Sequence, residues 1–392
     1  MDLLTPQGAL DRLTAGAWNP GGLPPAGSVP WADVVALARA TGAGGLIYHA
    51  AGGMLGAMPP AARRFFEDAY YLYVAENARG QQQLAQVGHA LSEAGAPLLL
   101  LKGAALGESV YASFALRLMG DIDLLIPSRH VPACRQVLMD LGYRPSAVEH
   151  QDGTRLAFSN QEAFEPPGPE DAVVELHWHV LDVPYYMKKV PIEFFWQESE
   201  PCTIAGHPFR ALTAVGNLVY LPAHLALHHQ FRSFHSSVDL ALLIVSQEGR
   251  IDWGAVGETA RGFDLLAALR ATLARLAQRW PSLPLAEARR VLSGLKPSRT
   301  EERLFRLLSA EERSTTLDFY TTLASLPDLW SRARYAWFNL FPQPAYMARR
   351  YGIHSRWTLP YWYALRVARG LPRLARAVPG ARRIEQRARE ES

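Results

Sequence analysis

Cysteine is scarce in this chain, which has 392 residues and only Cys134 and Cys202. The two cysteines lie far apart in the sequence, and neither belongs to a Cys-x-x-Cys pair. Their number and spacing exclude a disulfide framework and a thiolate zinc site. We therefore expect a protein of the reducing cytoplasm.

Long apolar runs are also missing. Lys102 interrupts the best candidate, and no run reaches the roughly 18–20 residues that a membrane-spanning helix needs. Residues 1–13 carry acidic side chains and lack the basic start and unbroken apolar centre of a secretory signal. The sequence therefore predicts a soluble protein with no transmembrane segment.

The chain has little excess charge of either sign, since 40 Lys and Arg residues stand against 37 Asp and Glu residues. A net charge of +3 gives the whole chain no strong attraction to nucleic acid or to an anionic membrane. Residues 361–392 differ, because they hold eight arginines against three glutamates, with Trp362 and Leu365 among them. This basic tail is a candidate for nucleic-acid or membrane-surface contact, and the alternative is a solvated helix or a frayed end.

Hydrophobic periodicity divides the chain into regions, and its length permits two or three packed units. Apolar residues recur every three to four positions before residue 95 and after residue 212, which predicts helices, whereas shorter apolar runs between them predict strands. We expect an α+β fold with a small mixed β-sheet core flanked by helices. The expected units are an N-terminal helical region (1–95), an α/β core (96–212), a C-terminal helical domain (213–360) and the basic tail (361–392).

The same patterns predict individual elements. Strands are expected at residues 97–101, 121–126, 154–158 and 173–180. Helices are expected at residues 31–48, 61–94, 104–111, 131–141, 221–245, 263–279 and 301–326. Residues 165–171 are expected to form a loop, because three prolines and a glycine prevent regular structure there.

The acidic pair in the run GDIDLL at residues 120–125 is the sharpest local feature. Alternation along a strand places Asp121 and Asp123 on one face with their carboxylates side by side. Two adjacent anions repel each other unless a cation lies between them, and Mg²⁺ is the hard, oxygen-preferring ion that also binds triphosphate oxygens. The pair therefore favours metal-assisted phosphoryl chemistry over a solvated acidic loop.

Basic residues precede this strand. Lys102 and Gly103 fall between an expected strand and the start of a helix, where backbone N–H groups and a glycine let a phosphate approach closely. Lys102 is then a candidate to neutralise phosphate charge, and Arg117 is a similar candidate. A short Lys-Gly pair is not specific, and the alternative for each cation is a solvent-facing side chain.

The run VVELHWH at residues 173–179 supplies a third carboxylate. Alternation would place Glu175, His177 and His179 on one face of a strand. Glu175 can complete a carboxylate triad and accept the proton of an attacking hydroxyl. His177 is a candidate for hydrogen bonding near Glu175 or to substrate, and the alternative is a zinc site made of Glu175 and the two histidines.

The ordered motifs together resemble a largely uncharacterised bacterial nucleotidyltransferase family within the polymerase-beta-like superfamily. They are LLLLKGAAL at residues 98–106, RLMGDIDLLI at 117–126, Gly142-Tyr143 and ELHW at 175–178, and weaker matches extend over about 30–360. The resemblance implies a mixed sheet of five or fewer strands and two Mg²⁺ ions held by Asp121, Asp123 and Glu175. It also implies transfer of a nucleoside monophosphate from an NTP, with release of pyrophosphate.

The chain departs from the wider superfamily at the first strand-to-helix turn. A Gly-Ser pair is typical there, whereas this chain has Lys102-Gly103-Ala104 and so lacks the serine contact to phosphate. Triphosphate binding is therefore less strongly implied than metal binding.

A polar stripe follows in the expected helix 221–245. At 100° per residue, its members fall within an arc of about 80° if the helix is continuous across residues 233–237. The stripe is either a solvated face or the wall of a cleft that contacts nucleotide or acceptor. Its members are His224, His228, Arg232, His235 and Asp239.

Three functions are compatible with these residues. The first is a magnesium-dependent nucleotidyltransferase that acts on a small molecule, a peptide or RNA. The second is a nucleotide-sensing or partner-binding protein that has the same fold and no turnover. The third is a zinc hydrolase built on Glu175, His177 and His179. The first is preferred, because the acidic set is intact.

Overall fold

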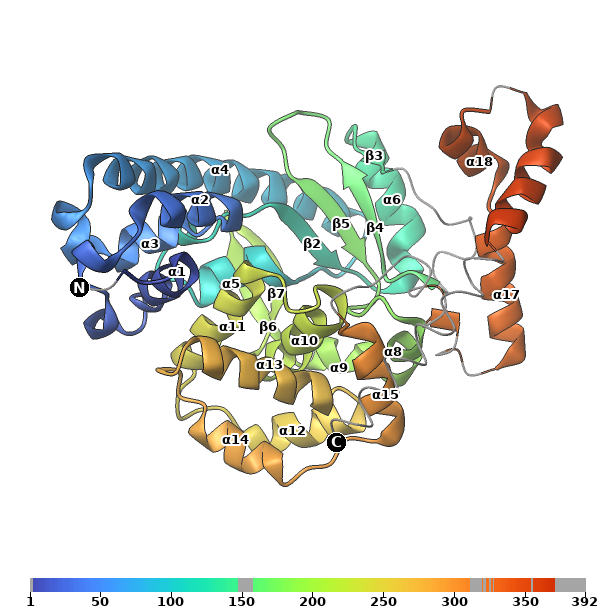
Figure 1. The fold of residues 1–392 in the computed structure, drawn as a ribbon. Coiled ribbons are helices and arrows are strands. Elements are labelled where there is room, and N and C mark those ends of the chain that lie inside the picture. Colours follow the sequence, from blue (N-terminus) through green and yellow to red (C-terminus); the bar gives the residue numbers. More distant parts are fainter. Residues whose placement is uncertain are drawn as a thin grey trace.

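The computed structural model describes residues 3–146, 158–310, 319, 322–323, 326, 328–353 and 355–370. Seven strands form one mixed sheet, in the order β3-β4-β5-β2-β1-β7-β6 (Figure 1). The strands are β1 (Leu99–Leu100), β2 (Asp121–Leu125), β3 (Arg144–Pro145), β4 (Gln161–Glu165), β5 (Val173–His177), β6 (Ser199–Ile204) and β7 (His207–Leu212). The expected α+β class is confirmed, but the expectation of five or fewer strands is wrong.

Helices surround the sheet on both faces. Before β1 lie α1 (Pro6–Ala15), α2 (Trp31–Thr41), α3 (Gly44–Ala50) and α4 (Pro60–Glu93). Within the sheet region lie α5 (Lys102–Ser109), α6 (Val131–Asp140), α8 (Pro184–Lys189) and α9 (Ile192–Gln197). After β7 lie α10 (Ala214–Ala223), α11 (Phe234–Ser246), α12 (Trp253–Gly262), α13 (Leu266–Arg279), α14 (Ala286–Ser293), α15 (Arg299–Leu308), α17 (Leu329–Leu340) and α18 (Pro344–Tyr351).

The two faces of the sheet pack against different helices. Ile122 and Leu124 of β2 belong to one buried cluster with Leu84 of α4 and Leu138 of α6. Leu125 belongs to the other cluster, which contains Leu218 of α10 and the apolar residues of α11 to α13. Because side chains alternate along a strand, the acidic residues of β2 lie on the face that the later helices cover.

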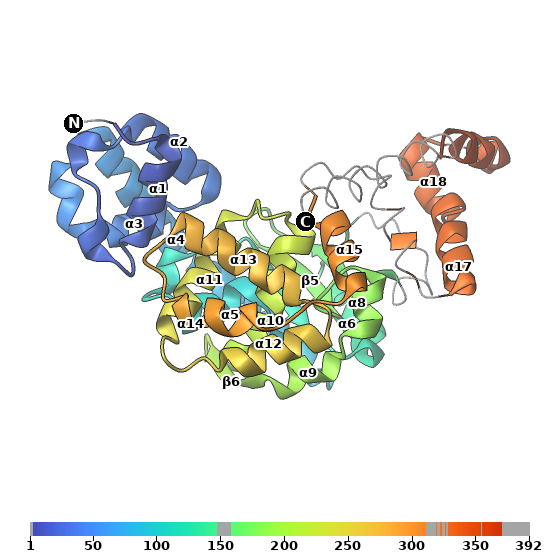
Figure 2. The same ribbon diagram turned by 60° about the horizontal axis from the view of Figure 1, so that its bottom comes forward.

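The ends of the molecule are formed by helices. Figures 1 and 2 both place α1 to α3 at one side and α17 with α18 at the opposite side. Residues 359–370 are also helical, and the ring of Trp362 stacks on Tyr351 of α18 with centroids 5.2 Å apart. The remainder of the basic tail lies outside the described residues. None of the described helices is both long enough and apolar enough to cross a membrane.

Three expected helices are interrupted. The helix expected at 301–326 ends at Leu308, the last residue of α15, and residues 309–310 are not helical. The helix expected at 31–48 is broken into α2 and α3 at Gly42, whose φ of +64° is left-handed. The helix expected at 221–245 is also broken, because α10 runs into a π-helical turn (His224–His228) and α11 begins only at Phe234. Ser233 caps α11 by accepting a hydrogen bond from the backbone of Ser236, so the assumed continuity across 233–237 is wrong.

Other expected elements match more closely. The long helix at 61–94 and the strand at 121–126 are confirmed as α4 and β2, and the loop at 165–171 separates β4 from β5. The strand expected at 173–180 ends at His177, and the strand expected at 154–158 lies almost wholly outside the described residues. Strands β3, β4, β6 and β7 were not expected.

Candidate active site

The central carboxylates come from two neighbouring parallel strands. In the register of β2 and β5, Asp123 lies opposite Glu175, and Asp121 lies opposite Val173. Residues 121 and 123 share a face because they are two positions apart on β2. The pairing therefore brings Asp121, Asp123 and Glu175 to one face of the sheet.

Two basic side chains contact the middle carboxylate. Lys102 Nζ and His177 Nε2 each lie 2.8 Å from Asp123 Oδ1, and His177 Nε2 is also 3.4 Å from Glu175 Oε2. The side chain of Asp123 is fully buried, whereas that of Glu175 is 20% exposed. The two basic side chains therefore balance the charge of Asp123 in the buried part of the site. Glu175 lies at the solvent-facing edge of the site.

The protonation properties of these residues follow from burial and charge. Burial, with the neighbouring carboxylate of Asp123, raises the pKa of Asp121 to about 6. Burial alone would also raise the pKa of Asp123, but the Lys102 ammonium and the hydrogen bond from His177 hold it well below its usual range. Burial would lower the pKa of His177, and its hydrogen bonds to Asp123 and Glu175 raise it instead. Lys102 and His177 balance the charge of Asp123 but not that of Asp121. A further cation is therefore favoured beside Asp121.

The residues present fit a hard divalent cation. Asp123, Glu175 and His177 offer ligand atoms that all lie within 4.8 Å of one another, and Asp121 and Glu175 line one cavity beside them. Asp123 Oδ2 is buried and has no hydrogen-bond partner in the described part of the chain. An unpaired buried acceptor costs about 1–3 kcal/mol, and more when it is charged. A cation beside Asp123 would remove that cost.

Lys102 occupies an unusual backbone position. It begins α5 with a φ of +47°, in the left-handed region that side chains other than glycine rarely adopt. The preceding residue, Leu101, donates its backbone N–H to the carbonyl of Asp123. This local strain places the Lys102 ammonium on the acidic cluster, in a turn next to the site.

Arg117 is held by a carboxylate from α11. Its Nε lies 2.8 Å from Asp239 Oδ1 and its Nη2 lies 3.0 Å from Asp239 Oδ2, and Tyr111 donates a third hydrogen bond to Asp239. Gly103 lies under the guanidinium, and a Cβ there would be 2.9 Å from Arg117 Cζ. The absence of a side chain at Gly103 therefore leaves room for the guanidinium of Arg117. In this state neither Arg117 nor Asp239 presents a free charge to a ligand.

The two histidines of the ELHWH run have different environments. His177 lies on β5 among the carboxylates, whereas His179 follows the end of the strand. Both ring nitrogens of His179 are used, since Nδ1 accepts from the N–H of Leu181 and Nε2 donates to the carbonyl of Val190. His179 is thus a buried histidine with a full set of partners, and it does not join the ligand set of Glu175 and His177. The zinc hydrolase hypothesis loses its third ligand.

A cavity of about 260 Å³ separates the carboxylates from the helical region. The sheet side contributes Lys102, Arg117, Asp121 and Glu175. The opposite wall contains His224, His228, His229, Ser233, His235 and Ser236. Of the polar stripe expected in this region, His224, His228 and His235 line the cavity, whereas Arg232 does not. Sequence periodicity missed His229.

A larger cavity of about 970 Å³ lies elsewhere, between α13, α14 and α15. Its walls combine four alanines and two leucines with three arginines, and the single carboxylate among the lining residues is Glu302. That composition offers no paired carboxylates for metal chemistry. The smaller cavity is therefore the better candidate for the active site.

One comparison with known proteins found a match. A family model described as uncharacterised nucleotidyltransferase matches residues 27–281, which is more than half of the chain. The chain belongs to this family. No curated protein and no solved structure matches it. The match contains the whole sheet together with α10, the π-helical turn and α11, so both walls of the cavity lie within the family region.

Proposed function

We propose that this protein transfers a nucleoside monophosphate from an NTP to the hydroxyl of an acceptor and releases pyrophosphate. Mg²⁺ would be held by Asp121, Asp123 and Glu175, in a site of the polymerase-beta type. The observation that carries the proposal is the parallel register of β2 and β5, which brings Asp123 beside Glu175 at a cavity also lined by Asp121. Membership of a nucleotidyltransferase family supports it.

In this reaction, the acceptor oxygen forms a bond to the α-phosphorus, and the bond from that phosphorus to the pyrophosphate oxygen breaks. Bound Mg²⁺ supplies neutralisation of the phosphate charge. Glu175 accepts the proton of the attacking hydroxyl, because its carboxylate is 20% exposed and lines the cavity in which the acceptor would bind. Strands β2 and β5 hold the carboxylates of Asp123 and Glu175 rigidly. Positioning of the reactants and neutralisation of their charge therefore supply most of the rate acceleration.

Lys102 has a second role in this proposal. Its ammonium balances Asp123 before the substrate binds. With a cation bound to the carboxylates, the Lys102 ammonium would be available to neutralise a phosphate oxygen of the NTP. It thereby replaces, with charge, the serine contact that is absent from the turn at Lys102-Gly103-Ala104. Gly103 and Arg117 shape this turn in the proposed site.

The donor nucleotide and the acceptor are found by a transfer assay. Each of ATP, GTP, CTP and UTP, labelled in the α-phosphate, is incubated with Mg²⁺ and with the protein itself, RNA or a pool of small hydroxyl compounds as acceptor. We expect label transfer with equimolar pyrophosphate release, and loss of both in Asp123→Asn. Turnover at the wild-type rate by Asp123→Asn would overturn the carboxylate assignment.

A nucleotide-binding protein without turnover is the second candidate. The contact of Lys102 with Asp123 favours it, because the ammonium already balances the charge of a carboxylate that would otherwise attract a metal ion. This candidate predicts NTP binding that persists without Mg²⁺ and no pyrophosphate release with any acceptor. The labelled transfer assay separates the two functions.

A further inference from the structure

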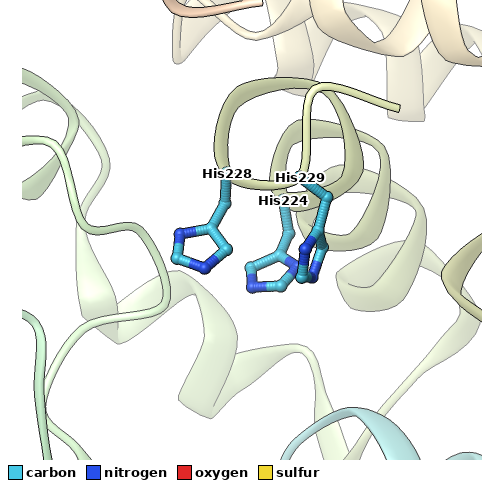
Figure 3. Close-up of side chains that lie close together, drawn as sticks. All are labelled: His224, His228 and His229. Atoms are coloured by element: carbon cyan, nitrogen blue, oxygen red, sulfur yellow. The ribbon is translucent and has the colours of Figure 1, made fainter. Parts of the chain in front are cut away.

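Three histidines converge on the wall of the cavity opposite the carboxylates. His224, His228 and His229 each offer a ring nitrogen, and these nitrogens all lie within 4.8 Å of one another. Figure 3 shows the three rings leaving one turn of helix toward the same side. The ring centroids are 4.7–4.9 Å apart in all three pairs. This is the ligand type that divalent transition metals prefer.

The backbone is built to bring these rings together. In an α-helix, a residue five positions on is rotated by about 140° from the first, so His229 would point away from His224. Here the turn is π-helical, and the N–H of His229 donates to the carbonyl of His224 at 3.2 Å. The wider turn carries His229 back beside His224 while His228 remains next to it.

The turn ends in a strained conformation. Gln230 and Phe231 both have left-handed φ values, of +46° and +62°, although neither is glycine. Phe231 is held there by Arg275, whose guanidinium lies 4.1 Å from its ring centroid. Strain of this kind is concentrated at functional sites.

The hydrogen bonds leave ligand atoms free. Asp182 Oδ2 lies 2.9 Å from His228 Nδ1. This contact orients the His228 ring and leaves its Nε2 atom available to the cluster. A carboxylate behind a histidine is the usual outer partner of a metal-bound imidazole. The ring nitrogens of His224 and His229 have no hydrogen-bond partner among the described residues, although His224 is buried.

We propose that His224, His228 and His229 bind one divalent transition-metal ion, with Zn²⁺ as the best fit to three imidazoles, and that Asp182 supports His228 from behind. Tetrahedral Zn²⁺ needs nitrogen atoms about 3.3 Å apart, which small rotations of the rings achieve from their present spacing. Three protein ligands leave a fourth position for water or for an oxygen atom of a molecule bound in the cavity.

This ion would be distinct from the proposed Mg²⁺. The carboxylate set on the sheet is hard and suits Mg²⁺, whereas the imidazole set suits softer ions. The proposal does not rest on nucleotidyl transfer, because metal binding is measured without nucleotide.

Cobalt titration tests the site directly. The full chain is stripped with a chelator, freed of the chelator and titrated with Co²⁺, with the visible d–d absorption as the readout. We expect one ion per chain with the spectrum of a four-coordinate site, and displacement of Co²⁺ by Zn²⁺. His228→Gln should weaken binding more than tenfold, and Asp182→Asn should weaken it by about 10- to 100-fold. His228 is the variant of choice because its side chain is 48% exposed, so that the fold tolerates the change.

Matched variants distinguish this site from its neighbours. His235→Gln changes a histidine of the same cavity wall outside the cluster, and it should bind Co²⁺ as the wild type does. His177→Gln changes the other candidate ligand set and should also retain the band. The proposal is overturned if His228→Gln and His229→Gln both bind Co²⁺ with wild-type affinity, or if His177→Gln abolishes the band.

Discussion

Arg117 and Asp239 form a buried ion pair with two parallel hydrogen bonds, of 2.8 and 3.0 Å, between the segment before β2 and helix α11. The two side chains are 11% and 2% exposed. The pair joins the sheet to the helical wall of the cavity, and so it fixes the distance between the carboxylates and the histidines. Neither residue need touch substrate to matter for function.

Breaking this pair should destabilise the protein strongly. Asp239→Asn leaves the Arg117 guanidinium buried without its anion, and loss of one partner of a buried pair costs about 3–5 kcal/mol. Urea unfolding measures the change. Glu258→Gln is the control, since it breaks the exposed pair with Arg261 and should cost less than about 1 kcal/mol. Equal stability of the two variants would contradict a structural role for Asp239.

Substitution by alanine should have opposite effects on stability at two glycines of α5. In Gly103→Ala the new methyl group collides with the guanidinium of Arg117, so we expect a loss of about 1–3 kcal/mol in unfolding free energy. In Gly107→Ala the new methyl group meets no atom within 4 Å, and better helix propensity should add about 0.5–1 kcal/mol. Thermal unfolding of both variants tests the comparison, and a stabilised Gly103→Ala protein would show that Arg117 does not lie over this glycine.

Stability should fall as the pH rises through neutrality because of Glu301. This carboxylate is fully buried at the start of α15, and burial raises its pKa from 4.5 to about 7. The folded protein therefore binds the proton more tightly than the unfolded chain. The resulting stability is fully present below about pH 4.5 and is lost as the pH rises through about 7, by up to about 3 kcal/mol.

Urea unfolding at about pH 5 and about pH 8 checks this dependence. Glu301→Gln should reduce the difference between the two pH values, because the amide does not ionise. Glu302→Gln alters the next residue, whose side chain is 44% exposed, and should leave the difference as it is in the wild type. An unchanged pH profile in Glu301→Gln would show that this carboxylate is not the source.

Local sequence patterns predicted the part of the site that depends on local structure. The alternation in Asp121–Leu125 is sufficient to place two carboxylates on one face, and the strand forms within one residue of its expected end. The pairing of Asp123 with Glu175 is different in kind. It depends on two strands about 50 positions apart lying parallel in register, and strand pairing is set by tertiary packing rather than by local pattern.

The elements that were missed lack the usual local signals. Strands β6 and β7 form a hairpin through Ala205-Gly206, where Ala205 has a left-handed φ of +48°, whereas Asn-Gly or Asp-Gly is the usual signature of such a turn. His229 was missed because a constant 100° per residue describes an α-helix and not a π-helical turn. The partner of Arg117 also could not be inferred, since Asp239 lies 122 positions away in the sequence.

The proposed metal–nucleotide site is tested most directly by calorimetric titration of the wild type and Glu175→Gln with the four NTPs, with and without Mg²⁺. Glu175 suits this test because its side chain is partly exposed and its removal leaves the contacts of Lys102 and His177 with Asp123 in place. We expect the wild type to bind at least one NTP in a Mg²⁺-dependent manner, and Glu175→Gln to keep the wild-type melting temperature and lose that dependence. Binding that is equally strong in Glu175→Gln, or independent of Mg²⁺ in both proteins, would contradict the assignment of these carboxylates to a metal–nucleotide site.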